Sequence, residues 1–148
     1  DTSGGSITSS ASVTSGSSHA VFLNPNGVCG TINTSGSTTQ YNTSSDYRMK
    51  ENVVDLDGAI TRVKQLAPKR FNFITDADTI VDGFLAHEAQ TVVPEAVTGT
   101  HNEVDSDNNP VYQGIDQSKL VPLLTAALQE AITKIETLET KVSALEGS

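Results

Sequence analysis

Ser45 and Lys50, a serine and a lysine five positions apart, are the residues of this chain that could perform covalent chemistry together. A serine hydroxyl is a poor nucleophile until a base removes its proton. A lysine amine can be that base when it is neutral, although a lysine pKa of about 10.4 in water leaves few amines neutral near pH 7. Burial in an apolar pocket lowers a lysine pKa and makes the amine a working general base. The pair therefore suggests a serine nucleophile with a lysine base, provided that the fold brings them together.

The spacing of the pair restricts how the two side chains can meet. Five residues along an α-helix turn through about 500°, which would leave the side chains about 140° apart on one straight helix. Ser45 must therefore lie in a turn before a helix, or the two residues must come from different subunits. The Ser45 hydroxyl also follows the carbonyl of Ser44 directly. Attack on that carbonyl would close a five-membered ring and move the acyl group from nitrogen to oxygen, and water would then cut the ester.

A structural interpretation of the same two residues competes with the catalytic one. Serine often caps the first turn of a helix, and lysine is usually a solvated side chain. On this interpretation Ser45 is a helix cap and Lys50 a surface residue. The spacing alone does not establish an enzyme.

The composition of the chain changes abruptly near residue 44. The preceding residues are mainly Ser, Thr, Gly and Asn, whereas all nine Lys and Arg residues follow residue 44. Residues 1–19 are of low complexity and predict either a stalk repeat or a flexible linker. The part after residue 44 is small for independent stability, so association would supply the missing burial. We therefore expect two parts, residues 1–44 and residues 45–148.

Charge and residue content argue against several functions. A net charge of −9 disfavours nucleic acid and anionic membrane as partners, and no apolar run is long enough to span a bilayer. Cys29 is the single cysteine and cannot form an intrachain disulfide. His87 and Glu88 match the start of a zinc-protease motif, but Thr91 stands where its second histidine would be. We therefore expect His87 to be a structural hydrogen-bonding residue, and we expect no metal or cofactor.

Residues 20–41 have the pattern of short strands joined by turns. Strands are expected at residues 20–23, 28–33 and 38–41, with a turn of Asn, Pro and Gly at residues 24–27. Two or three strands with so little apolar surface are marginal alone. Three copies wound together would protect the strand edges. Residues 1–44 are therefore expected to be the end of a β-rich trimeric stalk.

The middle of the chain predicts a small mixed domain. Two short helices are expected, at residues 58–66 with Asp57 as the cap and at residues 85–92. Pro68 and Pro94 would end them. Three strands are expected, at residues 70–74, 80–84 and 111–112. Residues 76–79 should form a turn, and residues 99–109 an exposed loop.

The end of the chain predicts a long helix that starts after a cap at Asp116, with Pro122 tolerated in its first turn. Its apolar residues recur at steps of three and four: Val121, Leu124, Leu128, Ala131, Ile135, Leu138, Val142 and Leu145. This is the a/d seam of a heptad repeat, and it predicts a coiled coil over about residues 117–146. The alternative is an amphipathic helix packed on its own domain, but the chain after Leu128 has no other domain to pack on. β-Branched residues at a with leucine at d favour a dimer locally.

Four segments of the sequence resemble a known family. They are YNTSSDYRMKENV at 41–53, GFLAHEAQ at 83–90, VPEAV at 93–97, and the stretch from Gly114 to Leu124. In this order they resemble the self-cleaving C-terminal intramolecular chaperone domain of phage tailspikes and tail fibres, of the endosialidase type. A related domain occurs in the myelin-regulatory-factor transcription factors. The resemblance covers about residues 41–135 and departs from the family at His87, where glutamine is more usual.

The resemblance implies an enzyme that acts once on its own chain. It implies a homotrimer, with Ser45 as nucleophile and Lys50 as base in a Ser-Lys dyad, and cleavage between Ser44 and Ser45. Asp46 and Arg48 are candidates for orienting the loop. The expected fold class is α+β, with a β-rich stalk end, a small mixed domain and a C-terminal coiled-coil helix. The heptad pattern alone mildly favours a dimer, but we expect a trimer because the family resemblance implies one.

The resemblance also implies a place and a set of partners. The partners are two further copies of the chain and the upstream fibre or spike domain of the same chain, with no nucleic acid and no membrane. The stalk part would lie in the virion tail fibre or spike, and the chaperone part would be released in the host cytoplasm. The alternative function is a non-catalytic trimeric receptor-binding tip of a viral fibre.

Overall fold

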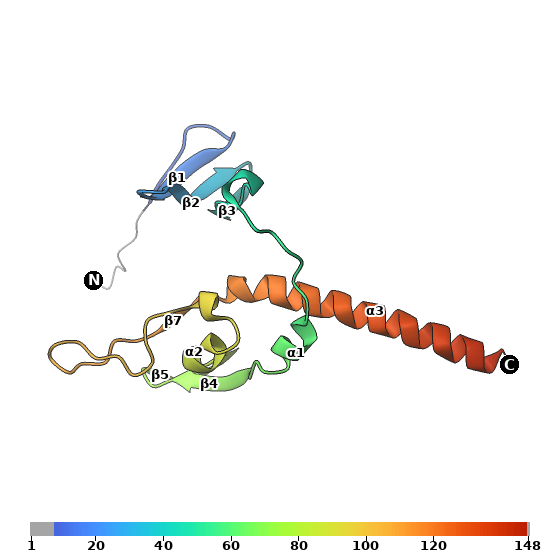
Figure 1. The fold of residues 1–148 in the computed structure, drawn as a ribbon. Helices are drawn as coiled ribbons and strands as arrows, with labels where there is room; N and C mark the ends of the chain where they lie inside the picture. Colours follow the sequence, from blue (N-terminus) through green and yellow to red (C-terminus); the bar gives the residue numbers. More distant parts are fainter. Residues whose placement is uncertain (1–7, 148) are drawn as a thin grey trace. The chain divides into compact units, whose positions relative to one another are not determined.

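The computed structural model describes residues 8–147, and the chain divides into two compact units, residues 1–53 and residues 54–148 (Figure 1). The fold class is α+β, as expected from the sequence: strands come first, a mixed unit follows, and a long helix ends the chain. Within the described residues, no helix combines the length and apolar character that a membrane span requires.

The first unit is a three-stranded antiparallel sheet in the order β1-β2-β3. Its strands are β1 (Ser17–Asn24), β2 (Gly27–Ser35) and β3 (Thr38–Thr43). They confirm the three expected strands and extend each of them. The turn between β1 and β2 forms because Asn24 Oδ1 accepts the N–H of Asn26 and Gly27 takes a φ of 103°, which glycine adopts without a steric cost. Of the low-complexity stretch, residues 17–19 belong to β1, whereas residues 1–7 lie outside the described part.

Strand β2 is irregular near its start. The register of β1 against β2 shifts between Phe22 and Leu23, which leaves Cys29 opposite no residue of β1. On the other side of β2, a Cβ added to Gly30 would lie 2.5 Å from the carbonyl oxygen of Asn42. Strand β3 therefore approaches β2 at Gly30 more closely than any side chain would permit.

In the second unit, the short helix α1 (Ala59–Val63) packs against α3 (Val121–Glu146), and a second short helix, α2 (Ala86–Gln90), contributes Ala89 to the same buried core. Its buried apolar core consists of small or medium side chains: Ala59, Ala89, Val92, Val93, Ala96, Val97, Leu120, Leu123 and Ala127. A core of this size stabilises a domain only modestly. Larger apolar residues on α3 remain exposed, so the second unit has apolar surface available for association.

Two small sheets and three short 3-10 turns complete the described part of the chain. The sheets pair β4 (Lys69–Phe73) with β5 (Asp76–Gly83), and β6 (Val97–Thr98) with β7 (Gly114–Ile115), both antiparallel. The 3-10 turns are η1 (Tyr47–Met49) in the first unit, and η2 (Pro94–Ala96) and η3 (Gln117–Leu120) in the second. On β4, Phe71 and Phe73 meet edge to face with ring centroids 5.5 Å apart, because residues two apart share one face of a strand.

The first helix of the second unit differs from the sequence prediction. Asp57 is not its cap: the N-cap is Gly58, which has a φ of 62° and no side chain to offer. The first N–H groups of α1 are accepted instead by the carboxylate of Glu130, from α3. The helix also ends at Val63 rather than residue 66, because the chain continues with the tighter i to i+3 bonding of a 3-10 turn.

Two strand predictions in the second unit are also wrong. Residues 76–79 were expected to turn, but Asp76 already pairs with Phe73, and the turn lies at residues 74–75. Residues 111–112 were expected to form a strand, but the strand is β7, which pairs with β6. A bridge between Val104 and Pro110 holds the exposed loop together, and the strand begins at Gly114, three residues later than expected.

The long helix α3 begins as expected and has two apolar faces. Asp116 accepts the N–H of Ser118 and caps η3, which runs directly into α3, and Pro122 lies in the first turn. One face carries Leu123 and Ala127, which are buried in the core. The other face is the expected heptad seam, most of whose residues are exposed. Figure 1 shows the second half of α3 extending past the other elements of its unit.

Candidate active site

Ser45 and Lys50 lie on either side of η1, and this short turn brings their side chains together. Within it, the N–H of Met49 bonds to the carbonyl of Asp46 and the N–H of Lys50 to that of Tyr47, each at 3.1 Å. The Nζ of Lys50 then lies 2.7 Å from the Oγ of Ser45. Ser45 thus precedes the turn, which is one of the two arrangements that the spacing allowed, and the two residues meet within a single chain.

The contact between the two side chains is short enough for proton transfer. In the structure, Lys50 Nζ donates a hydrogen bond to Ser45 Oγ. If the amine were neutral, the Ser45 hydroxyl could donate to the nitrogen over the same distance, which is the geometry of a general base beside a nucleophile. Both side chains are exposed in the single chain.

Asp46 and Arg48 close the turn that separates Ser45 from Lys50. Asp46 caps η1, since its Oδ1 accepts the N–H of Arg48 at 2.9 Å, so the alternative in which Ser45 is the helix cap is wrong. The guanidinium of Arg48 also donates to both carboxylate oxygens, at 2.9 and 2.8 Å. The side-chain hydrogen bond from Arg48 lowers the pKa of Asp46, assisted by the backbone N–H of Arg48 and the charge of Lys50.

Ser44, which precedes the nucleophile, is bonded to the sheet of the first unit. Its N–H donates to the carbonyl of Cys29 at 2.9 Å, and its Oγ donates to the carbonyl of Val28 at 2.6 Å. Ser44 therefore continues the pairing of β3 with β2 by one residue. The peptide bond between Ser44 and Ser45 joins a residue held on the sheet to a residue held by Lys50.

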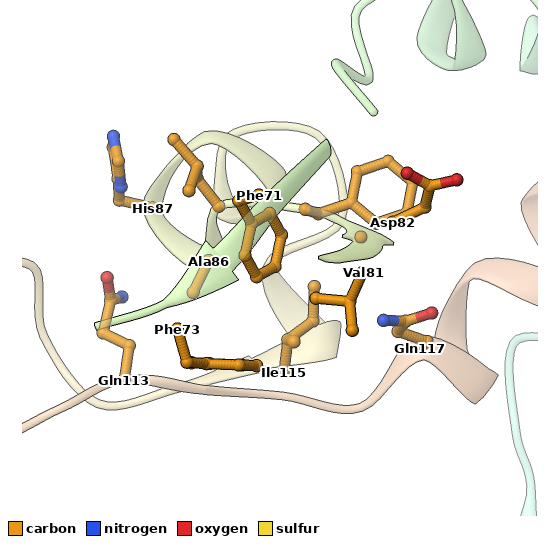
Figure 2. Close-up of a pocket in the computed structure, with 12 residues that line it drawn as sticks. Phe71, Phe73, Val81, Asp82, Ala86, His87, Gln113, Ile115 and Gln117 are labelled. Carbon is orange, nitrogen blue, oxygen red and sulfur yellow. The ribbon is translucent and has the colours of Figure 1, made fainter. Parts of the chain in front are cut away.

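An apolar hollow of about 560 Å³ lies in the second unit between the β4–β5 hairpin, α2 and residues 113–117. Figure 2 shows Phe71 in the middle of its lining, with His87 and Gln113 toward one end and Asp82 and Gln117 toward the other. None of its twelve lining residues is a serine, threonine, cysteine, lysine or tyrosine. The hollow therefore offers no hydroxyl, thiol or amine nucleophile, and its largely apolar lining suits packing or binding.

His87, the position that departs from the family pattern, stacks on another histidine. The rings of His87 and His101 are parallel within 5°, with centroids 4.3 Å apart. The ring of His87 thus serves as a stacking surface for the exposed loop, whereas the sequence suggested a hydrogen-bonding role. Within residues 8–147, no cluster of three or more His, Cys, Asp or Glu side chains is arranged to hold a metal ion.

Glu130 is a structural partner that the sequence prediction missed. Its two carboxylate oxygens accept the N–H groups of Ala59 and Ile60, at 2.6 and 3.2 Å. These bonds, that of Ala59 first, lower the pKa of Glu130. A signal was present in the sequence, because Leu123, Ala127 and Glu130 follow one another at helical spacing and place a carboxylate on the buried stripe.

Residues 45–98 match the model of a peptidase family described as chaperone of endosialidase. The match begins at Ser45 and contains Lys50 together with the segments at 83–90 and 93–97. The resemblance noted from the sequence is thereby confirmed over residues 45–98, which are similar to the endosialidase-chaperone family. A comparison with curated proteins finds no match to this chain.

Proposed function

We propose that this chain is an intramolecular chaperone that assembles three copies of a phage tail fibre or tailspike and then releases itself by cutting the bond between Ser44 and Ser45. The observation that carries the proposal is the 2.7 Å contact between Lys50 Nζ and Ser45 Oγ, at the first residue of the family match. Residues 1–44 are the end of the fibre stalk in this proposal, and residues 45–148 are the chaperone and protease domain.

The proposed reaction is an acyl shift followed by hydrolysis. The neutral amine of Lys50 takes the proton from Ser45 Oγ, and the oxygen attacks the carbonyl carbon of Ser44. The bond from that carbon to the nitrogen of Ser45 breaks as the lysine returns the proton to the nitrogen. An ester then joins Ser44 to Ser45 Oγ. Water cleaves this ester, which leaves a carboxylate on Ser44 and restores the hydroxyl of Ser45 next to a new amino terminus.

Assembly would switch this reaction on by changing the surroundings of Lys50. Several large apolar residues close to it in sequence are exposed in the single chain, among them Tyr47 at 80% and Val53 at 78%. A soluble protein usually buries such a group of side chains against a partner. Covering them in a trimer would remove water from the site and favour the neutral amine that the reaction requires. Cleavage would then follow assembly.

The seam of α3 supports the proposed trimer. Leu123, Ala127 and Glu130 already bind α3 to its own unit, so the amphipathic helix does pack on its domain. That contact uses a different face from the seam, and it leaves Leu128, Leu138 and most other seam residues exposed. An apolar stripe at heptad spacing on the free side of a helix is the pattern of a coiled coil. The seam alone does not fix the number of chains, and the choice of a trimer is taken from the family resemblance.

A chaperone of this kind suits the sheet that precedes it. The described part of residues 1–44 contains no buried residue, so its strands gain little as single chains. Pairing strands from different chains is slow and exposes edges to aggregation. A coiled coil forms from local contacts and can bring three chains into register first. We place the stalk in the virion tail and the released chaperone in the host cytoplasm.

Alanine substitutions at the proposed dyad test the function. The full chain is expressed as wild type, Ser45→Ala and Lys50→Ala, and each is run on a denaturing gel and sized in its native state. We expect two fragments from the wild type, one band from each variant, and a trimer in all three. Ser37→Ala and Lys64→Ala, which alter exposed residues away from η1, are matched controls and should cleave normally. A single wild-type band would favour the non-catalytic receptor-binding tip.

A further inference from the structure

The residue on the amino-terminal side of the proposed cut is held more firmly than its place in a loop would require. Ser44 lies beyond the end of β3, yet both its N–H and its hydroxyl bond to β2. The hydroxyl bond to Val28, at 2.6 Å, is at the short end of the usual range for such bonds. The two acceptors, Val28 and Cys29, are consecutive residues, so their carbonyls form one cradle for Ser44.

The cradle joins one regular acceptor to one irregular acceptor. Adjacent residues of a regular strand direct their carbonyls to opposite sides, toward different neighbouring strands. Cys29 continues the regular β2–β3 register opposite Ser44, so its carbonyl faces β3, whereas Val28, next to the register shift between β1 and β2, also accepts from Ser44. A β-bulge of this kind redirects groups at functional sites. Gly30, which follows, permits β3 to come close enough to complete the contact.

We infer that Ser44 is a positioning residue for the self-cleavage, and that its hydroxyl and N–H hold the scissile carbonyl against the β1-β2-β3 sheet within reach of Ser45. This inference rests on the proposed function and adds a condition to it. The cradle exists only after β2 has paired with β3. The cut therefore depends on the folding of the stalk end as well as on assembly of the chaperone, and a chain with an unfolded stalk keeps its chaperone.

The same geometry explains why the two halves of the site are anchored separately. Lys50 and η1 fix the nucleophile on one side of the bond, whereas β2 fixes Ser44 on the other. Orientation of the two reacting groups accounts for a large part of the rate in intramolecular reactions. An acyl shift between adjacent residues needs the carbonyl of Ser44 turned toward Ser45 Oγ, and a residue held at both its N–H and its side chain has little freedom to turn away.

Rates of cleavage in substituted chains test the inference. The full chain is purified under denaturing conditions, and folding is started by dilution. The fragment ending at Ser44 is followed over time by mass spectrometry, with the oligomeric state measured in parallel. Ser44→Ala removes only the hydroxyl bond and should slow cleavage about threefold to tenfold, the usual effect of one neutral hydrogen bond. Ser44→Thr keeps a hydroxyl and should restore most of the rate.

Two further variants separate positioning from a general effect on the sheet. Thr43→Ala removes a hydroxyl from the adjacent exposed residue, which makes no side-chain hydrogen bond within the described part of the chain, and should cleave within twofold of wild type. Gly30→Ala leaves Ser45 and Lys50 untouched but forces β3 away from β2, and should slow cleavage more than tenfold.

The outcomes distinguish this inference from the proposed function. Wild-type rates in both Ser44→Ala and Gly30→Ala would overturn the positioning role while leaving the Ser45–Lys50 reaction intact. Equal slowing of Thr43→Ala and Ser44→Ala, with no recovery in Ser44→Thr, would reduce the effect to strand stability and would also overturn it. A wild-type chain that assembles but is never cut between Ser44 and Ser45 would overturn the proposed function itself.

Discussion

Replacing Leu138 by aspartate should dissociate the proposed trimer and thereby stop cleavage. Leu138 is 59% exposed in the single chain, so about three-fifths of its surface is free to be buried by partner helices. Full burial of a leucine contributes about 1.5–3 kcal/mol, so three copies of this position would contribute about 3–5 kcal/mol to the trimer. Three unpaired carboxylates in the same layer would cost several kcal/mol more. A total near 10 kcal/mol would weaken association by about seven orders of magnitude.

The assay for this prediction needs two measurements and one control. Oligomeric state is measured by sedimentation in a Ser45→Ala background, where no cleavage interferes, and cleavage is measured on the otherwise wild-type chain. Thr140→Asp places the same charge two residues further along α3, outside the seam, and should leave both assembly and cleavage intact. A trimeric Leu138→Asp variant would show that the seam is not the interface. Efficient cleavage by a monomeric Leu138→Asp variant would refute the idea that assembly controls the reaction.

Three further predictions concern the loop, the second unit and the stalk. Asp46→Asn breaks the ion pair with Arg48 and should slow cleavage severalfold from neutral pH down to about pH 5. Because the pKa of Asp46 is lowered, the wild-type loop should persist until the pH falls below the ordinary aspartate range, and a chemical-shift titration can follow its loss. Glu130→Gln should lower the thermal midpoint of unfolding at neutral pH. Since folding lowers the pKa of Glu130, the difference in midpoint from wild type should shrink as the pH drops below the ordinary glutamate range and the wild-type carboxylate is protonated. A difference that does not change with pH would contradict the role of the Glu130 carboxylate as the cap of α1. Melted and cooled, a parent stalk carrying Ser45→Ala should recover its trimer, whereas the cleaved stalk freed of its chaperone should not; equal recovery would remove the proposed reason for self-cleavage.

The parts of the fold that the sequence predicted are those governed by local pattern. Alternation and turn composition located the strands of the first unit, and Asp116 with Pro122 located the start of α3. The arrangement of Ser45 and Lys50 could also be predicted from the sequence. A helix would keep the two side chains apart, so only a turn could bring them together within one chain. The structure provides that turn as η1.

The parts that the sequence did not predict depend on partners far along the chain. Asp57 was the obvious local cap for α1, but Glu130, more than seventy residues away, takes that role because α3 packs across the start of the helix. The stacking of His87 on His101 and the cradle that β2 forms for Ser44 are of the same kind. Propensity and spacing describe neighbours in sequence, whereas these contacts follow from tertiary packing.

The mass spectrum of the purified wild-type chain, recorded after assembly and compared with that of Ser45→Ala, tests the central claim most directly. The account predicts two wild-type masses that meet between residues 44 and 45, with the second fragment carrying Ser45 as a free amino terminus, and a single intact mass for the variant. An intact wild-type chain in an assembled trimer, or a cut at any other bond, would contradict it.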